Sequence, residues 1–107
     1  MENNWLIIWT AINEIAADFG RLDIVVANAG IATHEPALDV TPESFSSLMK
    51  VNLDGAFFTA QAAGKIFKKQ GSGNVIFTAS VSSILINIPQ TQAVSVRMDN
   101  HATLKIR

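Results

Sequence analysis

The fold of this chain is decided by the stretch Asp23-Ile-Val-Val-Ala-Asn-Ala-Gly30. Its first part is a short, continuous apolar run rich in β-branched residues, which is typical of a strand buried on both faces of a parallel sheet. Its last part, Asn28-Ala29-Gly30, is polar and small and ends the run. We therefore expect a strand over residues 23–27. At its carboxyl end the small residues let another backbone or a ligand approach closely, and the Asn28 amide can tie neighbouring strands together. A plain strand-to-loop turn is the alternative.

The sequence on both sides of this stretch predicts helices. Before it, apolar residues recur with helical spacing from Trp5 onward, and Gly20 ends the pattern. After a loop over residues 31–40, the run Thr41-Pro42-Glu43 supplies a capping hydroxyl, a first-turn proline and a first-turn acid. The apolar stripe that follows predicts a long helix of about seven turns that ends near Gly71.

A second strand is predicted by the apolar run Asn74-Val-Ile-Phe-Thr78, which leads into the small residues Ala79 and Ser80. Helix, strand, long helix and strand in this order form a βαβ unit, whose two strands lie parallel with the helix on one face. Ligands of such α/β sheets bind beyond the carboxyl ends of the strands. Asn28 and Ser80 fall at those ends, so the predicted site lies there.

Composition excludes several other classes of function. The chain has 107 residues, is 49% hydrophobic and carries a formal charge of −1, so we expect one domain with a core and no nucleic-acid partner. It contains no cysteine, and neither His34 nor His101 has a second ligand at metal-site spacing, so no metal is predicted. The apolar start Trp5-Leu-Ile-Ile-Trp9 is too short for a membrane span, and we expect a cytoplasmic protein.

Asn52, which is followed by Gly55, is a further candidate for a site beside Ser80. Asn52 and Gly55 interrupt the long helix, where each costs about 0.5–1 kcal/mol relative to alanine. They predict either a local bend with a polar group aimed at a site, or simply tolerated poor helix formers. Ser80 is placed to orient a substrate oxygen, although serines also end strands without a chemical role. No His or carboxylate is placed to activate it as a nucleophile.

Three segments together resemble the central part of the short-chain dehydrogenase/reductase family. They are residues 23–30, Val51-Asn-Leu-Asp-Gly55 and Gly73-Asn-Val-Ile-Phe-Thr-Ala-Ser80. The stretch Ala79-Ser-Val-Ser82 together with Asn87-Ile-Pro-Gln-Thr-Gln92 is similar to fungal members of the NADP-dependent mannitol dehydrogenase and sorbose or xylulose reductase type. The similarity covers about residues 11–93 and implies an α/β fold, the central fragment of a Rossmann-like, doubly wound parallel sheet.

The resemblance also implies roles for individual residues. Asn28, Ala29 and Gly30 would line the NADP groove. Asn52 would belong to a catalytic tetrad and hold a water that relays protons, and Ser80 would position the carbonyl or alcohol. The implied reaction is NADP(H)-dependent oxidation or reduction of a polyol, ketose or similar secondary alcohol or carbonyl. Family members are usually homotetramers or dimers.

The chain departs from the family pattern at both ends. The family's general-base tyrosine and its lysine correspond to Ser95 and Asp99, and the chain contains no tyrosine. No glycine-rich phosphate turn occurs either. We therefore expect residues 1–93 to be a partial NAD(P)-binding domain and residues 94–107 to be an irregular tail foreign to the family.

The pair Val94-Ser95 can be encoded by GTA-AGT, a typical intron donor. We therefore consider two alternatives to an active oxidoreductase. One is an inactive fragment, the product of a retained intron or a truncated gene model. The other is a non-enzymatic interaction protein that dimerises through its long helix.

Overall fold

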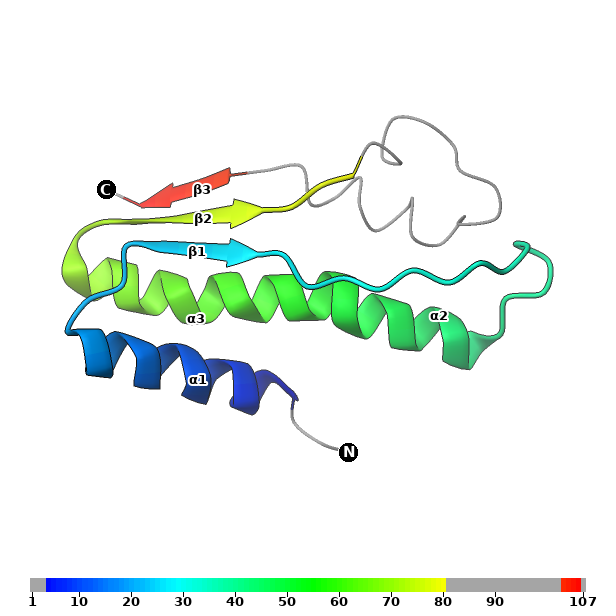
Figure 1. Ribbon diagram of the computed structural model, residues 1–107, viewed down its shortest axis with the longest axis horizontal. Helices are drawn as coiled ribbons and strands as arrows, with labels where there is room; N and C mark the ends of the chain where they lie inside the picture. Colours follow the sequence, from blue (N-terminus) through cyan, green and yellow to red (C-terminus); the bar gives the residue numbers. More distant parts are fainter. Residues whose placement is uncertain (1–3, 81–102, 107) are drawn as a thin grey trace.

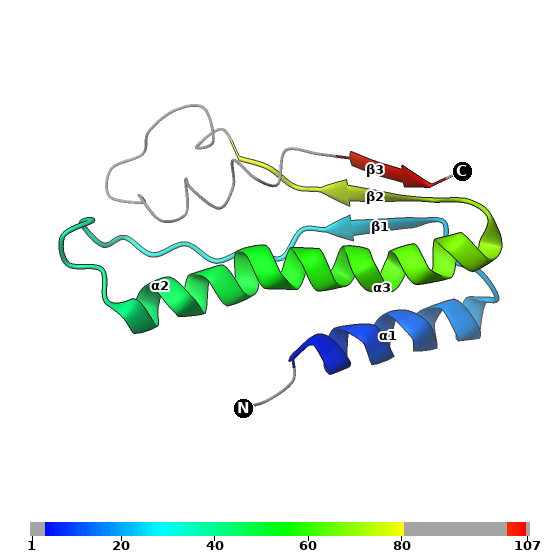
Figure 2. The same cartoon turned by 180° about the vertical axis from the view of Figure 1, so that it is seen from behind.

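The computed structural model describes residues 4–80 and 103–106 as three layers: a small sheet, one long helical rod, and a second helix beside the rod (Figure 1). The elements in chain order are α1 (Asn4–Phe19), β1 (Ile24–Ala27), α2 (Pro42–Met49), the π-helical turn η1 (Lys50–Asp54), α3 (Gly55–Gln70), β2 (Gly73–Phe77) and β3 (Thr103–Ile106). Helix α3 contacts both β1 and β2 and, on its other side, α1. Front and back views agree on this arrangement (Figure 2). None of the helices in this described part is long and apolar enough to cross a membrane.

The sheet confirms the predicted βαβ unit. β1 pairs parallel to β2 from Ile24 opposite Asn74 to Ala27 opposite Phe77. The pairing is continued at both ends, where the Asn74 N–H donates to the Asp23 carbonyl at 3.0 Å and the Thr78 N–H donates to the Ala27 carbonyl at 3.2 Å. The carboxyl ends of both strands therefore meet at one edge, as the predicted site requires.

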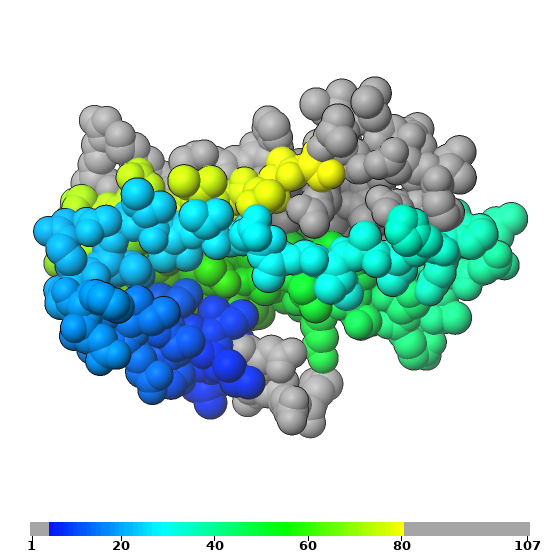
Figure 3. Space-filling view, in the orientation of Figure 1, coloured from blue at the N-terminus to red at the C-terminus, as the bar shows by residue number. Residues whose placement is uncertain are grey.

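The expectation that β1 is buried on both faces is wrong. Ile24 and Val26 are 58% and 52% exposed, whereas Val25 packs into the core beneath α3. Figure 3 shows β1 and the segment after it, in cyan, uncovered on this face of the molecule. The reason is that α1 and α3 both lie on one side of the sheet. No other helix of the described part packs against the opposite face.

The long helix begins and ends as its sequence predicts. The Ser44 N–H donates to the Thr41 hydroxyl at 3.1 Å, which caps the first turn ahead of Pro42. At the other end Gly71 adopts a left-handed conformation with φ of 87°, and its N–H donates to the Phe67 carbonyl at 2.8 Å. A glycine takes that conformation without steric cost, so the chain turns sharply from α3 into β2.

The main hydrophobic core lies between α3 and the sheet. Ala60, Ala63, Phe67 and Val75 form it. The Phe67 ring is completely buried and covers Gly73 so closely that a Cβ there would lie 2.1 Å from the ring. The first residue of β2 is thus a glycine because the helix above it carries a large aromatic side chain.

The expectation of an irregular tail is wrong at residues 103–106. They form β3, which pairs antiparallel to β2, so that the sheet order is β1-β2-β3. The sequence pattern there is too short to distinguish a strand, and the open edge of β2 supplies the backbone partners that make one. Residues 94–102 of the expected tail lie outside the described residues.

Candidate functional site

The site is organised by the side-chain amide of Asn52, which is only 3% exposed. Its Oδ1 accepts a hydrogen bond from the Ile31 N–H at 2.8 Å, and its Nδ2 donates to the Ile31 carbonyl, also at 2.8 Å. The amide thus imitates a neighbouring strand and satisfies both backbone groups of one loop residue. Asn52 thereby ties the segment that follows β1 to the long helix.

Asn52 reaches this position because the helix widens around it. Residues 50–54 form a π-helical turn, and the Gly55 N–H donates to the Lys50 carbonyl five residues back. The sequence predicted either a local bend with a polar group aimed at a site or tolerated poor helix formers. The structure shows the local deviation, with the Asn52 amide bonded to the loop after β1. Its role in a site stays a prediction. Single π turns inside α-helices are frequent at functional sites.

Asn28 joins the carboxyl ends of the two parallel strands. Its Oδ1 accepts a hydrogen bond from the Thr78 hydroxyl at 2.8 Å, across 50 residues of sequence. The sequence indicated that this asparagine could tie neighbouring strands, and this is confirmed. Thr78 was missed as its partner, although a hydroxyl at the end of an apolar run was the available signal.

Ala29 and Gly30 are held between these two anchors. Asn28 fixes the segment on the side of β2, and Asn52 fixes it at Ile31. Between the anchors Ala29 and Gly30 are exposed and carry almost no side chain. The result is a supported, open stretch of backbone at the carboxyl edge of the sheet, which suits close contact with a flat or extended ligand.

The loop that follows is anchored by a third polar contact. The Ser44 hydroxyl donates to both carboxylate oxygens of Glu35, at 2.9 and 3.1 Å. Ser44 lies in the first turn of α2, so this contact holds the middle of the loop over residues 31–40 against the start of the long helix. Sequence reasoning did not identify this pair, because nothing local links a loop acid to a helix serine.

The remaining predicted site residues are brought together only in part. Ser80 is half-buried and stands two residues beyond Thr78, so it lies past the carboxyl end of β2 as predicted. From the βαβ crossover we also expect Asn52 and Ser80 to approach each other beneath the carboxyl ends of the two strands, and this stays a prediction. Ser95 and Asp99 lie outside the described residues.

The ion pair between Arg21 and Asp23 lies at the opposite, amino end of β1. There the hydrogen bond from Arg21 holds the pKa of the Asp23 carboxyl below its ordinary value. Across residues 4–80 and 103–106, no three His, Asp or Glu side chains gather to hold a metal ion. Among the described residues, Asn28 and Thr78 bring hydrogen-bonding groups to the carboxyl edge of the sheet, beside the exposed backbone of Ala29 and Gly30.

The amino-acid sequence of this chain is similar to those of known proteins. The sequence model of a family described as short chain dehydrogenase matches residues 7–93. A probable NADP-dependent mannitol dehydrogenase of Yarrowia lipolytica is 50% identical over 86 residues, which cover 78% of this chain and 31% of that protein. A sorbose reductase of Schizosaccharomyces pombe is 45% identical over 94 residues, which cover 87% of this chain and 37% of that protein.

Solved structures show the same similarity. A short-chain type dehydrogenase/reductase from Mycobacterium marinum superposes with a TM-score of 0.81 at 35% identity, over 85% of this chain and 38% of that one. A gluconate 5-dehydrogenase from Burkholderia cenocepacia, solved with NADP and tartrate, gives 0.79 at 35% identity, over 85% and 36%. The chain thus spans about a third of the length of the proteins that it matches.

Proposed function

The chain belongs to the short-chain dehydrogenase family, and from this membership we propose that it forms the central part of an NADP(H)-dependent oxidoreductase. The proposed substrates are a polyol and its ketose, or a similar secondary alcohol and carbonyl. The names of its relatives, mannitol dehydrogenase and sorbose reductase, support this substrate class. The observation that carries the proposal is the buried Asn52 amide, which fixes the loop after β1 at the carboxyl edge of the sheet.

Asn52 is proposed to organise the proton path. Its side chain holds Ile31 through two hydrogen bonds, so the loop and the π-helical turn keep one relative position. A water held beside this turn would then meet the substrate oxygen in a fixed geometry. Fixed geometry matters because proton transfer depends on donor and acceptor lying within hydrogen-bond reach.

Ser80 is proposed to position the substrate oxygen. When a carbonyl is reduced, negative charge develops on its oxygen, and a hydroxyl donor placed there stabilises that charge. The position of Ser80 just beyond β2, half-buried at the same edge as Asn28, supports this role. The general acid must come from elsewhere, because the 107 residues contain no tyrosine and a serine hydroxyl such as that of Ser95 is far too weak an acid.

Asn28, Ala29 and Gly30 are proposed to form one wall of the cofactor groove. Small, exposed residues on a backbone anchored at both ends fit the flat surface of a dinucleotide. The chemistry that such a cofactor supplies when bound is hydride transfer. The sequence contains no glycine-rich phosphate turn, so we expect the 107-residue chain alone to have little hold on the pyrophosphate.

A chimera tests the catalytic roles. Residues 11–93 replace the matching segment of the Yarrowia lipolytica mannitol dehydrogenase, and mannitol-dependent formation of NADPH is measured by absorbance. We expect an active enzyme in which Ser80→Ala lowers kcat by about a hundredfold or more, the usual cost of losing a group that stabilises developing charge. Asn13→Ala removes an exposed hydrogen bond within α1 and is the matched control, expected to leave kcat unchanged. A Ser80→Ala chimera as active as its parent would contradict the assignment.

The alternative is that the chain is an inactive fragment, and the absence of tyrosine favours it. An experiment on the isolated 107-residue chain tests this alternative. We expect titration with NADPH, followed by its nicotinamide fluorescence, to give no saturable signal, and no turnover of mannitol. Saturable binding by the 107-residue chain would show that residues 28–30 hold the cofactor without a phosphate turn.

A further inference from the structure

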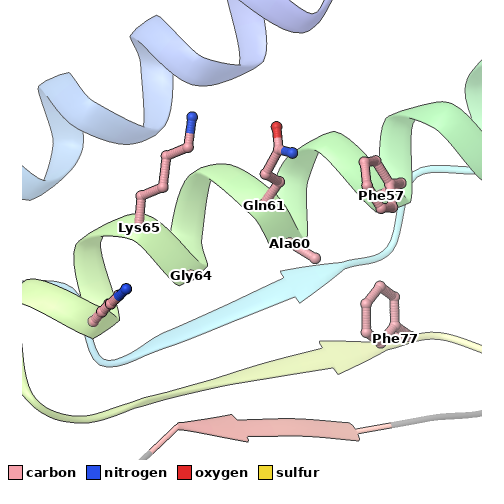
Figure 4. Close-up of a pocket in the computed structure, with 7 residues that line it drawn as sticks. Phe57, Ala60, Gln61, Gly64, Lys65 and Phe77 are labelled. Atoms are coloured by element: carbon pink, nitrogen blue, oxygen red, sulfur yellow. The ribbon is translucent and has the colours of Figure 1, made fainter.

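Strand β3 lies along the edge of β2 that β1 leaves open. The sheet order is β1-β2-β3, so β2 is the central strand and has a partner on each side. Figure 4 shows this order beneath α3, with β3 in pale red on the far side of β2 from β1. β3 also contacts α3, the helix that covers the core side of the sheet. The strand is therefore part of the layered structure, and it covers a backbone edge that would otherwise be open.

The backbone groups of β2 point alternately toward β1 and toward β3. The Asn74 and Thr78 N–H groups donate to carbonyls on the β1 side. Successive residues of an extended strand direct their N–H and C=O groups to opposite sides. Gly73 and Val75 therefore direct theirs toward β3. In the absence of β3, only water or another chain could satisfy these groups.

Every second residue of β3 directs its backbone groups to β2. Leu104 lies opposite Val75, and Ile106 lies opposite Gly73. Two opposite residues of an antiparallel pair direct their backbone groups either both toward each other or both away. Leu104 and Ile106 therefore turn their N–H groups to β2, whereas Lys105 turns its N–H outward. A substitution at Leu104 can thus remove a donor to β2, and one at the next residue cannot.

The edge of β2 favours association when it is bare. The six residues 74–79 carry no charge and no proline and include Val75, Ile76 and Phe77, a composition typical of segments that stack into cross-β assemblies. β3 favours association less, because it has only four residues and contains Lys105, and short edge strands with a lysine are poor partners for another strand. β3 therefore replaces an edge that favours association by one that disfavours it.

We propose that residues 103–106 are an edge cap, a segment that competes with strands of other copies of this chain for the backbone of β2 and so limits self-association. β1 is the other edge strand of the sheet. With the cap in place, pairing through strand edges is confined to β1 and ends with two copies. Without the cap, both edges are open and the assembly continues to grow. The cap rests on backbone pairing alone and is independent of the proposed reaction.

A chain that ends at residue 102 tests the edge cap. Amide hydrogen exchange is measured at a concentration at which light scattering shows monomers. The Val75 N–H faces β3 and should exchange faster after truncation, whereas the Ile76 N–H faces β1 and should stay protected. At higher concentration, light scattering and thioflavin T fluorescence should grow in the truncated chain well beyond the level of the full chain. Equal exchange of Val75 in the two chains, or equal growth, would overturn the proposal.

Charge does not explain the expected growth. The truncation removes Lys105 and Arg107, so the formal net charge changes from −1 to −3. The stronger repulsion between copies opposes association. Faster growth of the truncated chain would therefore come from the open edge of β2.

Two proline substitutions in the full chain separate the backbone pairing from the presence of the tail. Leu104→Pro removes an N–H that faces β2 and should speed exchange at Val75 about fivefold, the change that corresponds to one main-chain hydrogen bond. Lys105→Pro removes an N–H that faces outward, where an edge strand tolerates proline, and should leave exchange and scattering unchanged. Both variants keep all 107 residues, so they decide the question even where the truncated chain does not fold. Equal effects of the two substitutions would refute the edge cap.

Discussion

Replacing Asn52 by alanine tests whether its amide holds the site together. The substitution removes two hydrogen bonds of 2.8 Å from a side chain that is 3% exposed. Each such bond contributes about 1 kcal/mol net to the free energy of unfolding. A buried backbone group that is left without its hydrogen-bond partner lowers the stability further. The better helix propensity of alanine offsets about 0.6 kcal/mol of this loss of stability. Because Ile31 is partly exposed, water can replace some of the lost bonding. The free energy of unfolding should therefore fall by about 2 kcal/mol.

Urea unfolding followed by far-ultraviolet circular dichroism measures this change. Hydrogen exchange at the Ile31 amide is the local readout, since its N–H is bonded to Asn52 and should exchange faster in the variant. Asn13→Ala is the control, because Asn13 makes one exposed hydrogen bond within α1 and should give a change near zero. If Asn52→Ala and Asn13→Ala had the same stability, and Ile31 exchanged equally in both, the anchoring role of Asn52 would be refuted.

The isosteric variant Asn52→Asp separates the two bonds. Its carboxylate can still accept from the Ile31 N–H but would face the Ile31 carbonyl without a proton to donate. Burial beside a carbonyl raises the pKa of a carboxyl above its ordinary value. A raised folded-state pKa means that the loss of stability is greatest at neutral pH and shrinks as pH falls through that pKa, because the protonated form donates again. A loss of stability that did not change with pH would contradict this geometry.

Three further substitutions follow from the fold, each measured by thermal unfolding or light scattering. Gly73→Ala places a Cβ 2.1 Å from the Phe67 ring and should cost about 1–3 kcal/mol through overpacking; an unchanged Tm would show that the ring can move aside. Thr41→Ala removes the helix cap and should cost about 1 kcal/mol, whereas Thr41→Ser should restore it. Ile24→Lys places a charge on the uncovered face of β1, beside Val26, and should lower self-association without altering helix content; undiminished scattering would mean that another surface associates.

The local structure of this protein could be predicted from its sequence. The run at residues 23–30 marked a strand and the turn after it, and Thr41-Pro42 marked the start of the long helix. Asn52 and Gly55 marked the place where that helix deviates. Each of these features depends on interactions within a few residues along the chain, which is why propensity, capping and periodicity reveal them.

The contacts between distant groups depend on how the elements pack and could not be predicted from the sequence. Asn52 reaches Ile31 across 21 residues and Thr78 reaches Asn28 across 50, and neither partner could be chosen from spacing alone. The exposure of one face of β1 could not be predicted either, because an apolar run has the same sequence pattern whether or not a helix covers it. A hydrogen bond between distant residues, or the burial of a face, depends on where whole elements pack. That packing brings together surfaces that the order of residues leaves far apart.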